Sequence, residues 1–343
     1  MPRGFESAYA YARACGSLAR SYLDDRAVAL ASSHRVGEAW KSMFGEAPPA
    51  LPESELATAA ERALRSRPYE ALEGIEPELA RTDPFFGALV RKREIVYLED
   101  LLAAAAEGRA VAPAPFDSSF DTEFDPAAYP DLAKMLRRSR YQWAIDSGLS
   151  DLPAVKNRLD RQYFAELWAA ARELPEVLAD AIPALMRTEA ELENVAWALR
   201  LKRYYRMGAA EIEGRLVELD GAEVRARALE ALAFRPDARS DWAGWKWSRL
   251  VPGLGAGLGP GQGGAETGEW RLSHRGLEAA ARKYRYRLLK RCLHLHMDSY
   301  TPLYAFFRLK EMESDAMRGI VEGIKLEAPA AEIAAAAQSA GAA

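Results

Sequence analysis

The two histidines that lie closest to each other in this sequence are in the last quarter of the chain. His294 and His296 are two residues apart. On a helix, side chains with that spacing point roughly 200° apart, whereas two ligands on one face need a spacing of four. The chain contains no H-E-x-x-H and no C-x-x-C motif. We therefore expect no metal site.

A glycine-rich run formally contains the pattern of a dinucleotide-binding loop. Gly259, Gly261 and Gly264 spell G-x-G-x-x-G. We expect no strand before them and Pro260 interrupts them, so the pattern lacks the context of a nucleotide site. A Walker loop would need a G-K-[ST] sequence, which this run does not contain. The run is predicted to be a surface loop that binds no cofactor.

Nucleophile motifs are also missing from the sequence. No G-x-S-x-G occurs, and neither Cys15 nor Cys292 has neighbours that would activate its thiol. Cys292 falls in an apolar series with spacings of three and four: Leu277, Ala281, Tyr284, Leu288, Cys292 and Leu295. Both cysteines are predicted to pack as small apolar residues. We expect no catalytic residue and no small-molecule substrate, so the chain is predicted not to be an enzyme.

Positive charge is concentrated in one segment, between Arg271 and Arg291. Its basic residues are Arg271, Arg275, Arg282, Lys283, Arg285, Arg287, Lys290 and Arg291, against one acid, Glu278. Alternating arginines and tyrosines could bind single-stranded nucleic acid. The overall pI of about 5.8 argues against that, because nucleic-acid modules are strongly basic. An acidic protein partner is the interpretation we prefer.

Length and composition describe a globular protein. With 343 residues, the chain is long enough for two or three structural units. Its 49% hydrophobic and 28% charged residues are typical of a folded, water-exposed chain. Two isolated cysteines suit a reducing compartment, so we expect a cytoplasmic location. No run of 18 apolar residues occurs, so we expect any membrane association to be peripheral.

The elements that must position these residues are predicted to be helices, with no convincing strand. Ala, Leu, Glu and Arg are abundant, and sustained period-two alternation is absent. A first helix collects Ala8, Tyr11, Cys15, Leu18 and Tyr22 on one stripe. Further helices are expected at 53–66, 85–107, 128–148, 153–172, 185–207, 222–232, 271–296 and 301–326. Segments 108–131 and 252–268 are predicted loops.

Polar residues interrupt the apolar faces of two of these helices. In 301–326, Glu313 lies on the same stripe as Phe306 and Ile320 and needs a partner if buried. Candidates are Lys310, Arg318 or backbone donors of a neighbouring helix. In 185–207, a similar group interrupts an apolar run. The two predicted structural polar clusters are Glu193, Asn194 and Arg200, and Lys310, Glu311, Glu313 and Arg318.

Three stretches about one hundred residues apart resemble one another. They are REIVYLEDLL (93–102), ENVAWALRLKRYY (193–205) and LKEMESDAMRGIVEGI (309–324). Each mixes acids with apolar residues and has a glycine near or just beyond its end, namely Gly108, Gly208 and Gly323. This spacing is compatible with a threefold helical repeat.

The segment 301–333 carries a recognisable pattern, made by Pro302, Tyr304, Lys310, Glu311, Glu313, Arg318, Gly319, Gly323 and Lys325. It resembles the C-terminal signature of the V/A-type ATPase central-stalk family, whose members are found in both prokaryotic and eukaryotic enzymes. ENVAWALRLKRYY and AYAYARACGSLARSYL resemble the central and N-terminal helices of the family. The sequence departs from the family in having Ser314 or Ala316 where an asparagine is common, and in the glycine-rich loop 253–264.

The resemblance implies an all-α, funnel-shaped protein with three similar helical units around a pseudo-threefold axis. The units would be 1–115, 116–215, and 216–343 with the Gly-rich loop 252–268 and a C-terminal tail. It further implies a non-catalytic protein on the cytoplasmic face of the membrane that couples the rotating shaft to the ion-translocating rotor ring. The polar clusters would fix helix register inside the funnel wall.

Charged side chains would then help the chain to dock onto its protein partners. We expect the segment's arginines and lysine, Arg282, Lys283, Arg285 and Arg287, to face an acidic shaft or ring loop. A generic helical protein-binding scaffold and an RNA-binding helical protein are the alternatives. The sequence does not distinguish protons from sodium ions, or ATP synthesis from hydrolysis.

Overall fold

The computed structural model describes residues 7–23, 25–115, 121–146, 149, 151–221, 223–254 and 270–341. Within these ranges every regular element is a helix, which confirms the all-α prediction. No helix of the described chain is long and apolar enough to cross a membrane. Gly259, Gly261, Gly264 and most of the loop 252–268 lie outside the described residues.

The helices follow one another along the chain with mostly short connections. In chain order they are α1 (Ser7–Leu18), α2 (Asp25–Ala31), α3 (Val36–Phe44), α4 (Glu53–Ile75), α5 (Leu79–Thr82), α6 (Pro84–Val90), α7 (Lys92–Ala106), η1 (Pro126–Ala128), α8 (Leu132–Met135), α9 (Trp143–Asp146), α10 (Leu152–Arg172), α11 (Glu176–Ala179), α12 (Ile182–Arg200), the π-helix η2 (Leu201–Tyr205), α13 (Ala209–Glu213), α14 (Glu223–Ala233), α15 (Arg239–Ala243), η3 (Ser248–Leu250), α16 (His274–Leu295), α17 (Thr301–Lys325) and α18 (Ala330–Gly341).

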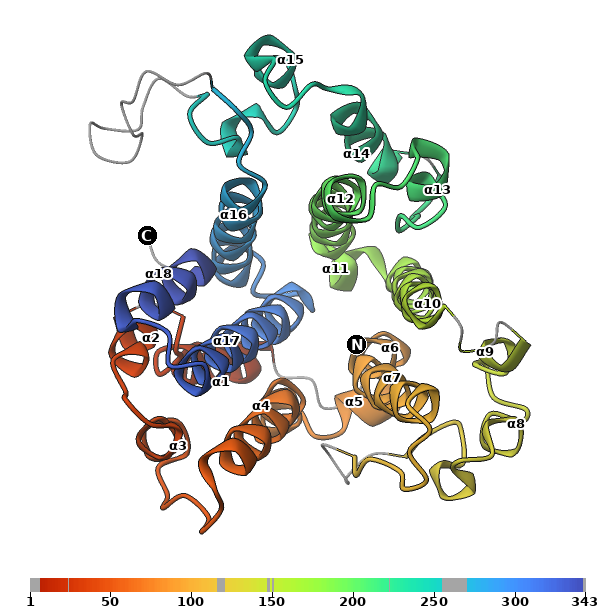
Figure 1. Cartoon of the computed structure of the whole chain (residues 1–343), viewed down its shortest axis with the longest axis vertical. Helices are drawn as coiled ribbons and strands as arrows, with labels where there is room; N and C mark the ends of the chain where they lie inside the picture. Colours follow the sequence, from red (N-terminus) through yellow and green to blue (C-terminus); the bar gives the residue numbers. More distant parts are fainter. Residues whose placement is uncertain are drawn as a thin grey trace.

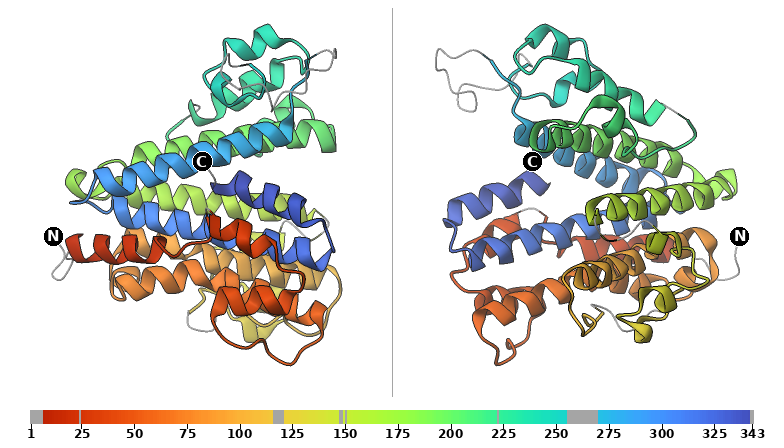
Figure 2. Two further views of the ribbon diagram at one scale, coloured as in Figure 1. Left: turned by 90° about the vertical axis from the view of Figure 1, so that its left-hand side faces the viewer. Right: turned by 45° about the vertical axis from the view of Figure 1, so that its right-hand side comes forward.

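The long helices stand around a central hollow. Figure 1 looks along them and shows α4, α7, α10, α12, α16 and α17 arranged in a ring, with most of the shorter helices outside it. Figure 2 shows that the long helices run roughly side by side across the molecule. Whether this ring has a pseudo-threefold axis and a funnel shape stays a prediction.

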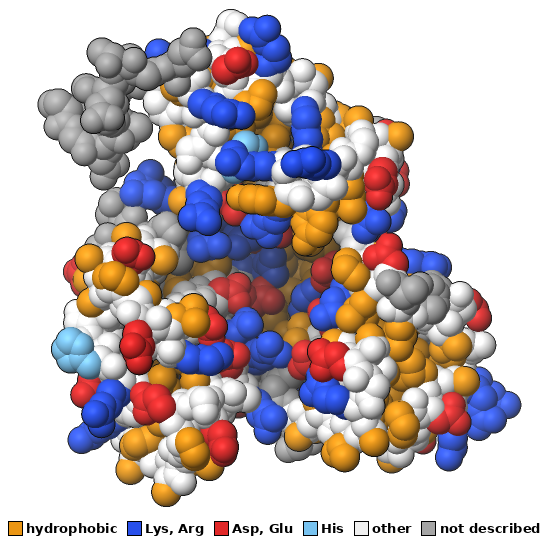
Figure 3. Space-filling model, viewed as in Figure 1, with side chains coloured by type: hydrophobic (Ala, Val, Ile, Leu, Met, Phe, Trp, Pro, Cys, Tyr) orange, Lys and Arg blue, Asp and Glu red, His pale blue; other side chains and the backbone are white. Residues whose placement is uncertain are grey.

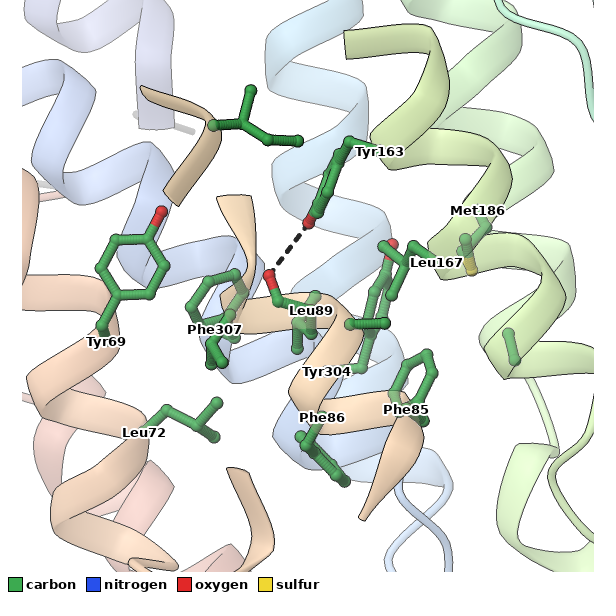
Figure 4. Packing of buried hydrophobic residues seen from close by; sticks show 14 of the residues in the cluster. Tyr69, Leu72, Phe85, Phe86, Leu89, Tyr163, Leu167, Met186, Tyr304 and Phe307 are labelled. Carbon is green, nitrogen blue, oxygen red and sulfur yellow. Dashed lines mark hydrogen bonds between the residues drawn. The ribbon is translucent and has the colours of Figure 1, made fainter. Parts of the chain in front are cut away.

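Buried apolar side chains form three clusters. The largest includes aromatic residues of α6 and α17, where the ring of Phe85 contacts the rings of Phe86 and Tyr304 (Figure 4). The second joins α2, α3 and α4 to α17 and α18, and so brings both ends of the chain together. The third packs α12, α14 and α16 around Trp242, Trp245 and Trp247. The expected units therefore share their cores, and their boundaries stay a prediction.

Helix α4 extends beyond its expected end. We expected it to stop at residue 66. A proline in a helix leaves the carbonyl four residues earlier without its donor. Pro68 lies inside α4, which continues to Ile75. The carbonyl oxygen of Leu64 instead accepts a hydrogen bond from the Ser314 hydroxyl of α17, at 2.7 Å. A tertiary contact thus replaces the missing backbone bond.

Three other expectations were wrong in detail. The helix expected at 85–107 is broken at Arg91 into α6 and α7. The helix expected at 128–148 is reduced to short pieces, with Pro130 near its start and a left-handed Arg138 (φ 64°) inside it. The first helix, expected to include Tyr22, ends at Leu18 as α1. Part of the C-terminal tail forms α18, which packs against α17 and α2.

Candidate functional site

The central hollow is lined by charged side chains from six helices. It has two lobes of about 260 Å³ and 360 Å³, which share Lys92, Glu311 and Asp315. Helices α7, α10 and α17 border both lobes, while α12 and α16 border the first lobe and α4 the second. Basic side chains outnumber acidic ones along its walls. Figure 3 shows the hollow open on the face seen in Figure 1, with basic and acidic groups inside it.

The floor of the hollow is a buried polar network on α17. The Arg308 guanidinium lies 3.2 Å from the Glu189 carboxylate of α12 and also pairs with Glu311. The Tyr304 hydroxyl donates to Glu189 at 2.6 Å. Burial raises the pKa of Glu311 and raises the pKa of Tyr304 well above its ordinary value. Each charge has an opposite partner, as a buried charge requires.

Helix α7 adds a further pair of ionisable groups. Lys92 bonds to Asp160 of α10. About two turns later, Glu99 lines the second lobe, and its Oε1 is buried without a hydrogen-bond partner among the described residues. Burial, and then the negative charge of Asp160, raises the pKa of Glu99 to about 7. We therefore expect this carboxyl to change its charge near neutral pH.

Three central helices each hold a distant loop by the same kind of bond. Glu94 of α7 accepts from the backbone N–H of Glu123 at 2.5 Å. Asn194 of α12 accepts from the N–H of Val217 at 2.7 Å. Glu313 of α17 accepts from the N–H of Tyr22 at 2.8 Å. All three acceptor side chains are buried. Pro183 and Pro302 lie at the starts of α12 and α17, eleven positions before Asn194 and Glu313, whereas Pro84, ten positions before Glu94, starts the preceding helix α6.

Comparison with known proteins places this helical ring in a family. The family described as ATP synthase (C/AC39) subunit matches residues 117–336, more than half of the chain. The chain belongs to this family. Its members are stalk subunits of V/A-type ATPases, which confirms the resemblance found in the sequence. They are accessory subunits of that machine.

A second comparison extends the likeness beyond the matched segment. The AC39-family chain is 22% identical over 329 residues to an uncharacterized protein of Treponema pallidum (strain Nichols). The match covers 94% of this chain and 93% of that protein, so it spans both ends of the ring.

In this AC39-family chain, the first predicted polar cluster does not form one group. Asn194 is fully buried and holds the segment around Val217, also donating to the carbonyl oxygens of Val217 and Val224. Two ion pairs join α12 to α16 instead. Glu193 pairs with Arg285 at 3.9 Å, and Arg200 with Glu278 at 2.8 Å. Glu193 and Arg200 are seven residues apart on α12, and Glu278 and Arg285 are seven residues apart on α16. The two pairs therefore connect the helices in antiparallel order.

The second predicted polar cluster, which lies on α17, does not form one group either. Glu313 has one of its candidate partners, the Lys310 ammonium at 2.6 Å, and its backbone donor is the Tyr22 N–H of the segment between α1 and α2 instead of a helix. Arg318 is not a partner of Glu313, because it pairs with Asp315 at 3.2 Å on a more exposed side of the helix. Glu311 faces the hollow with Arg308. The role of both clusters in fixing helix register stays a prediction.

The four basic residues predicted to dock a partner lie on two sides of α16. Arg285 lines the hollow, and Arg282, three positions earlier on the same side, is exposed. Lys283 and Arg287 are four positions apart and share a different side of the helix. The hollow therefore contains one of the four, with a second next to it.

The histidines and cysteines belong to the packing at the end of α16. His294 bonds to the Tyr11 hydroxyl at 2.8 Å, and His296 to Asp180 at 2.6 Å, so they face different neighbours. Burial raises the pKa of the Cys292 thiol. The predicted apolar series fails at its end, because Leu295 is exposed.

Sequence reasoning missed most of the hollow. Arg308, Glu189, Lys92 and Asp160 lie on four different helices, and no local spacing connects them. One signal was available in α17, where Tyr304, Arg308 and Glu311 are spaced by four and three and so share a face.

Proposed function

We propose that this chain is the non-catalytic central-stalk subunit of a rotary V/A-type ATPase, coupling the rotating shaft to the membrane rotor ring. It would sit at the cytoplasmic face of the membrane through protein contacts. The observation that carries the proposal is the open central hollow with its excess of basic side chains, in a chain of the stalk family. The hollow would receive the end of the shaft.

A coupler must transmit torque without deforming, and several contacts suit that task. The antiparallel ion pairs Glu193–Arg285 and Arg200–Glu278 oppose sliding of α12 along α16 in either direction. The buried Arg308–Glu189 pair joins α17 to α12 beneath the hollow. Buried polar contacts of this kind specify register even where they add little stability.

The bonds from Glu94, Asn194 and Glu313 support the proposed pseudo-threefold funnel. Each is a buried side-chain oxygen on a central helix that accepts a backbone N–H from an outer segment. One of these acceptors lies in each of the proposed units 1–115, 116–215 and 216–343, which supports three similar units. Each unit would contribute one central helix that holds an outer segment of the next unit, since Glu123, Val217 and Tyr22 lie in the units that follow those of Glu94, Asn194 and Glu313.

The two sides of α16 would contact different partners. Arg282 and Arg285, at the hollow, would face an acidic part of the shaft. Lys283 and Arg287, on another side, would face an acidic loop of the rotor ring. Charge complementarity would mainly speed association and orient the partners.

The shaft assignment is tested by binding of the full chain to the purified shaft of its ATPase. Arg282→Glu with Arg285→Glu should weaken binding strongly, while Lys283→Glu with Arg287→Glu is the matched control of equal charge change. Thermal unfolding of both variants should show that they remain folded. Equal binding of the shaft by wild type and by the Arg282→Glu, Arg285→Glu variant would contradict the assignment.

A further inference from the structure

The end of α12 carries an exposed aromatic and basic segment beside the hollow. The π-helix η2 presents Tyr204 and Tyr205, whose exposed fractions are 59% and 62%. Lys202, Arg203 and Arg206 are exposed beside them. Between Glu193 and Glu211 the chain has four basic residues and no acidic one. We call residues 202–206 the η2 rim.

The η2 rim continues a stripe that begins inside the hollow. Glu193 and Trp197 line the first lobe and are one turn apart on α12. The Arg200 guanidinium lies 5.9 Å from the Trp197 ring, and Tyr204 follows four residues later. A molecule seated in the lobe and extending out along α12 would therefore meet Trp197, then Arg200, then the tyrosines.

Backbone geometry holds the rim in an uncommon conformation. The helix widens from α to π over Leu201–Tyr205 and ends at Arg206, which has a left-handed φ of 55°. The Arg206 N–H donates to the Leu201 carbonyl oxygen, so this left-handed residue closes the end of the helix. Lys202 and Arg203 anchor the segment, bonding to the Leu232 carbonyl oxygen and to His274. The two tyrosines have no comparable role in the core.

We propose that the η2 rim binds an acidic α-helix of the protein seated in the hollow. This rests on the proposed function, since the hollow must be a socket for the rim to extend it. Exposed tyrosines and arginines are the residue types that contribute most energy to protein interfaces. The uniform positive charge of the rim selects an acidic partner. A helix suits the stripe, because its side chains also repeat every three to four residues.

The test uses the purified full chain and the purified shaft of its ATPase as the probe. Tyr204→Ser with Tyr205→Ser should weaken binding by at least roughly tenfold, since two interface tyrosines are removed. Arg206→Gln should weaken it less and reduce its salt dependence. Tyr9→Ser is the matched control, because Tyr9 is 54% exposed on α1. It should bind as wild type does, and all variants should unfold at the wild-type temperature.

Three other outcomes distinguish the failure of the rim proposal from the failure of the proposed function. If the tyrosine variant binds as wild type does while the Arg282→Glu, Arg285→Glu variant does not, the rim proposal is overturned and the socket remains. If wild type does not bind the shaft, the proposed function fails. If the tyrosine variant loses binding to phosphatidylserine vesicles but keeps binding to the shaft, the rim contacts anionic lipid and the proposal is wrong.

Discussion

The Ser314 hydroxyl donates a hydrogen bond to the backbone carbonyl oxygen of Leu64, 2.7 Å away, across the interface of α17 and α4. Leu64 is four residues before Pro68, so this is the carbonyl that the proline deprives of its helical partner. One side chain thereby allows α4 to continue past a proline and ties the first long helix to the last.

We predict that Ser314→Ala lowers the free energy of unfolding by about 1–3 kcal/mol, because the buried carbonyl is left without a donor. Pro68→Ala restores a backbone N–H at that position, so the same serine substitution should cost much less in the Pro68→Ala background. Denaturant unfolding of the four proteins of this cycle measures the coupling. Additive effects of the two substitutions would contradict the account.

Asn194 should be among the least replaceable residues of α12. Asn194→Asp places a carboxylate against the carbonyl oxygens of Val217 and Val224 and removes both donated bonds. We expect a loss of at least about 2 kcal/mol and faster amide hydrogen exchange at Val217. The neighbouring change Glu193→Gln, at a half-exposed ion pair, should stay within about 0.5 kcal/mol. An unchanged rate of hydrogen exchange at the Val217 amide would show that Asn194 does not hold this segment.

Glu99 makes stability depend on pH in a defined direction. Its folded-state pKa of about 7 exceeds its ordinary value of 4.5, so the folded chain binds the proton more tightly than the unfolded chain. Stability should therefore fall as the pH rises from 4.5 to about 7, and the loss should be complete above that.

The measurement is the unfolding temperature of wild type and Glu99→Gln at about pH 5 and about pH 8, on either side of that range, where the neutral amide removes this titration. Wild type should lose stability relative to Glu99→Gln between the two values. Glu55→Gln, an exposed change on α4, should leave the wild-type difference intact. If wild type and Glu99→Gln change their unfolding temperatures equally between the two pH values, this carboxyl does not titrate in that range.

Two glycines of α17 should respond oppositely to the same substitution. A Cβ on Gly323 would lie 2.8 Å from Cγ1 of Ile333 on α18, whereas one on Gly319 would meet nothing within 4 Å. Gly323→Ala should cost about 1–3 kcal/mol through overpacking. Gly319→Ala should stabilise by up to about 1 kcal/mol through helix propensity. Thermal unfolding of both variants is sufficient, and a stabilised Gly323→Ala would refute the close approach.

Helical periodicity was enough to predict the fold class and most of the long helices, because α10, α12, α16 and α17 each have clear apolar faces. It failed where tertiary contacts overrule local preference, as at Pro68, whose effect is offset by a serine 246 positions later. The burial of Glu313 could be anticipated from its stripe. The Arg308–Glu189 pair could not, since only the closed ring brings α12 and α17 together.

The central claim is coupling, and its most direct test is to remove this chain from its ATPase and measure ATP hydrolysis and ATP-driven ion transport separately. The account predicts that the head still hydrolyses ATP while ion transport is lost, and that adding back the purified chain restores transport. Transport that continues at the original rate without this chain would contradict it.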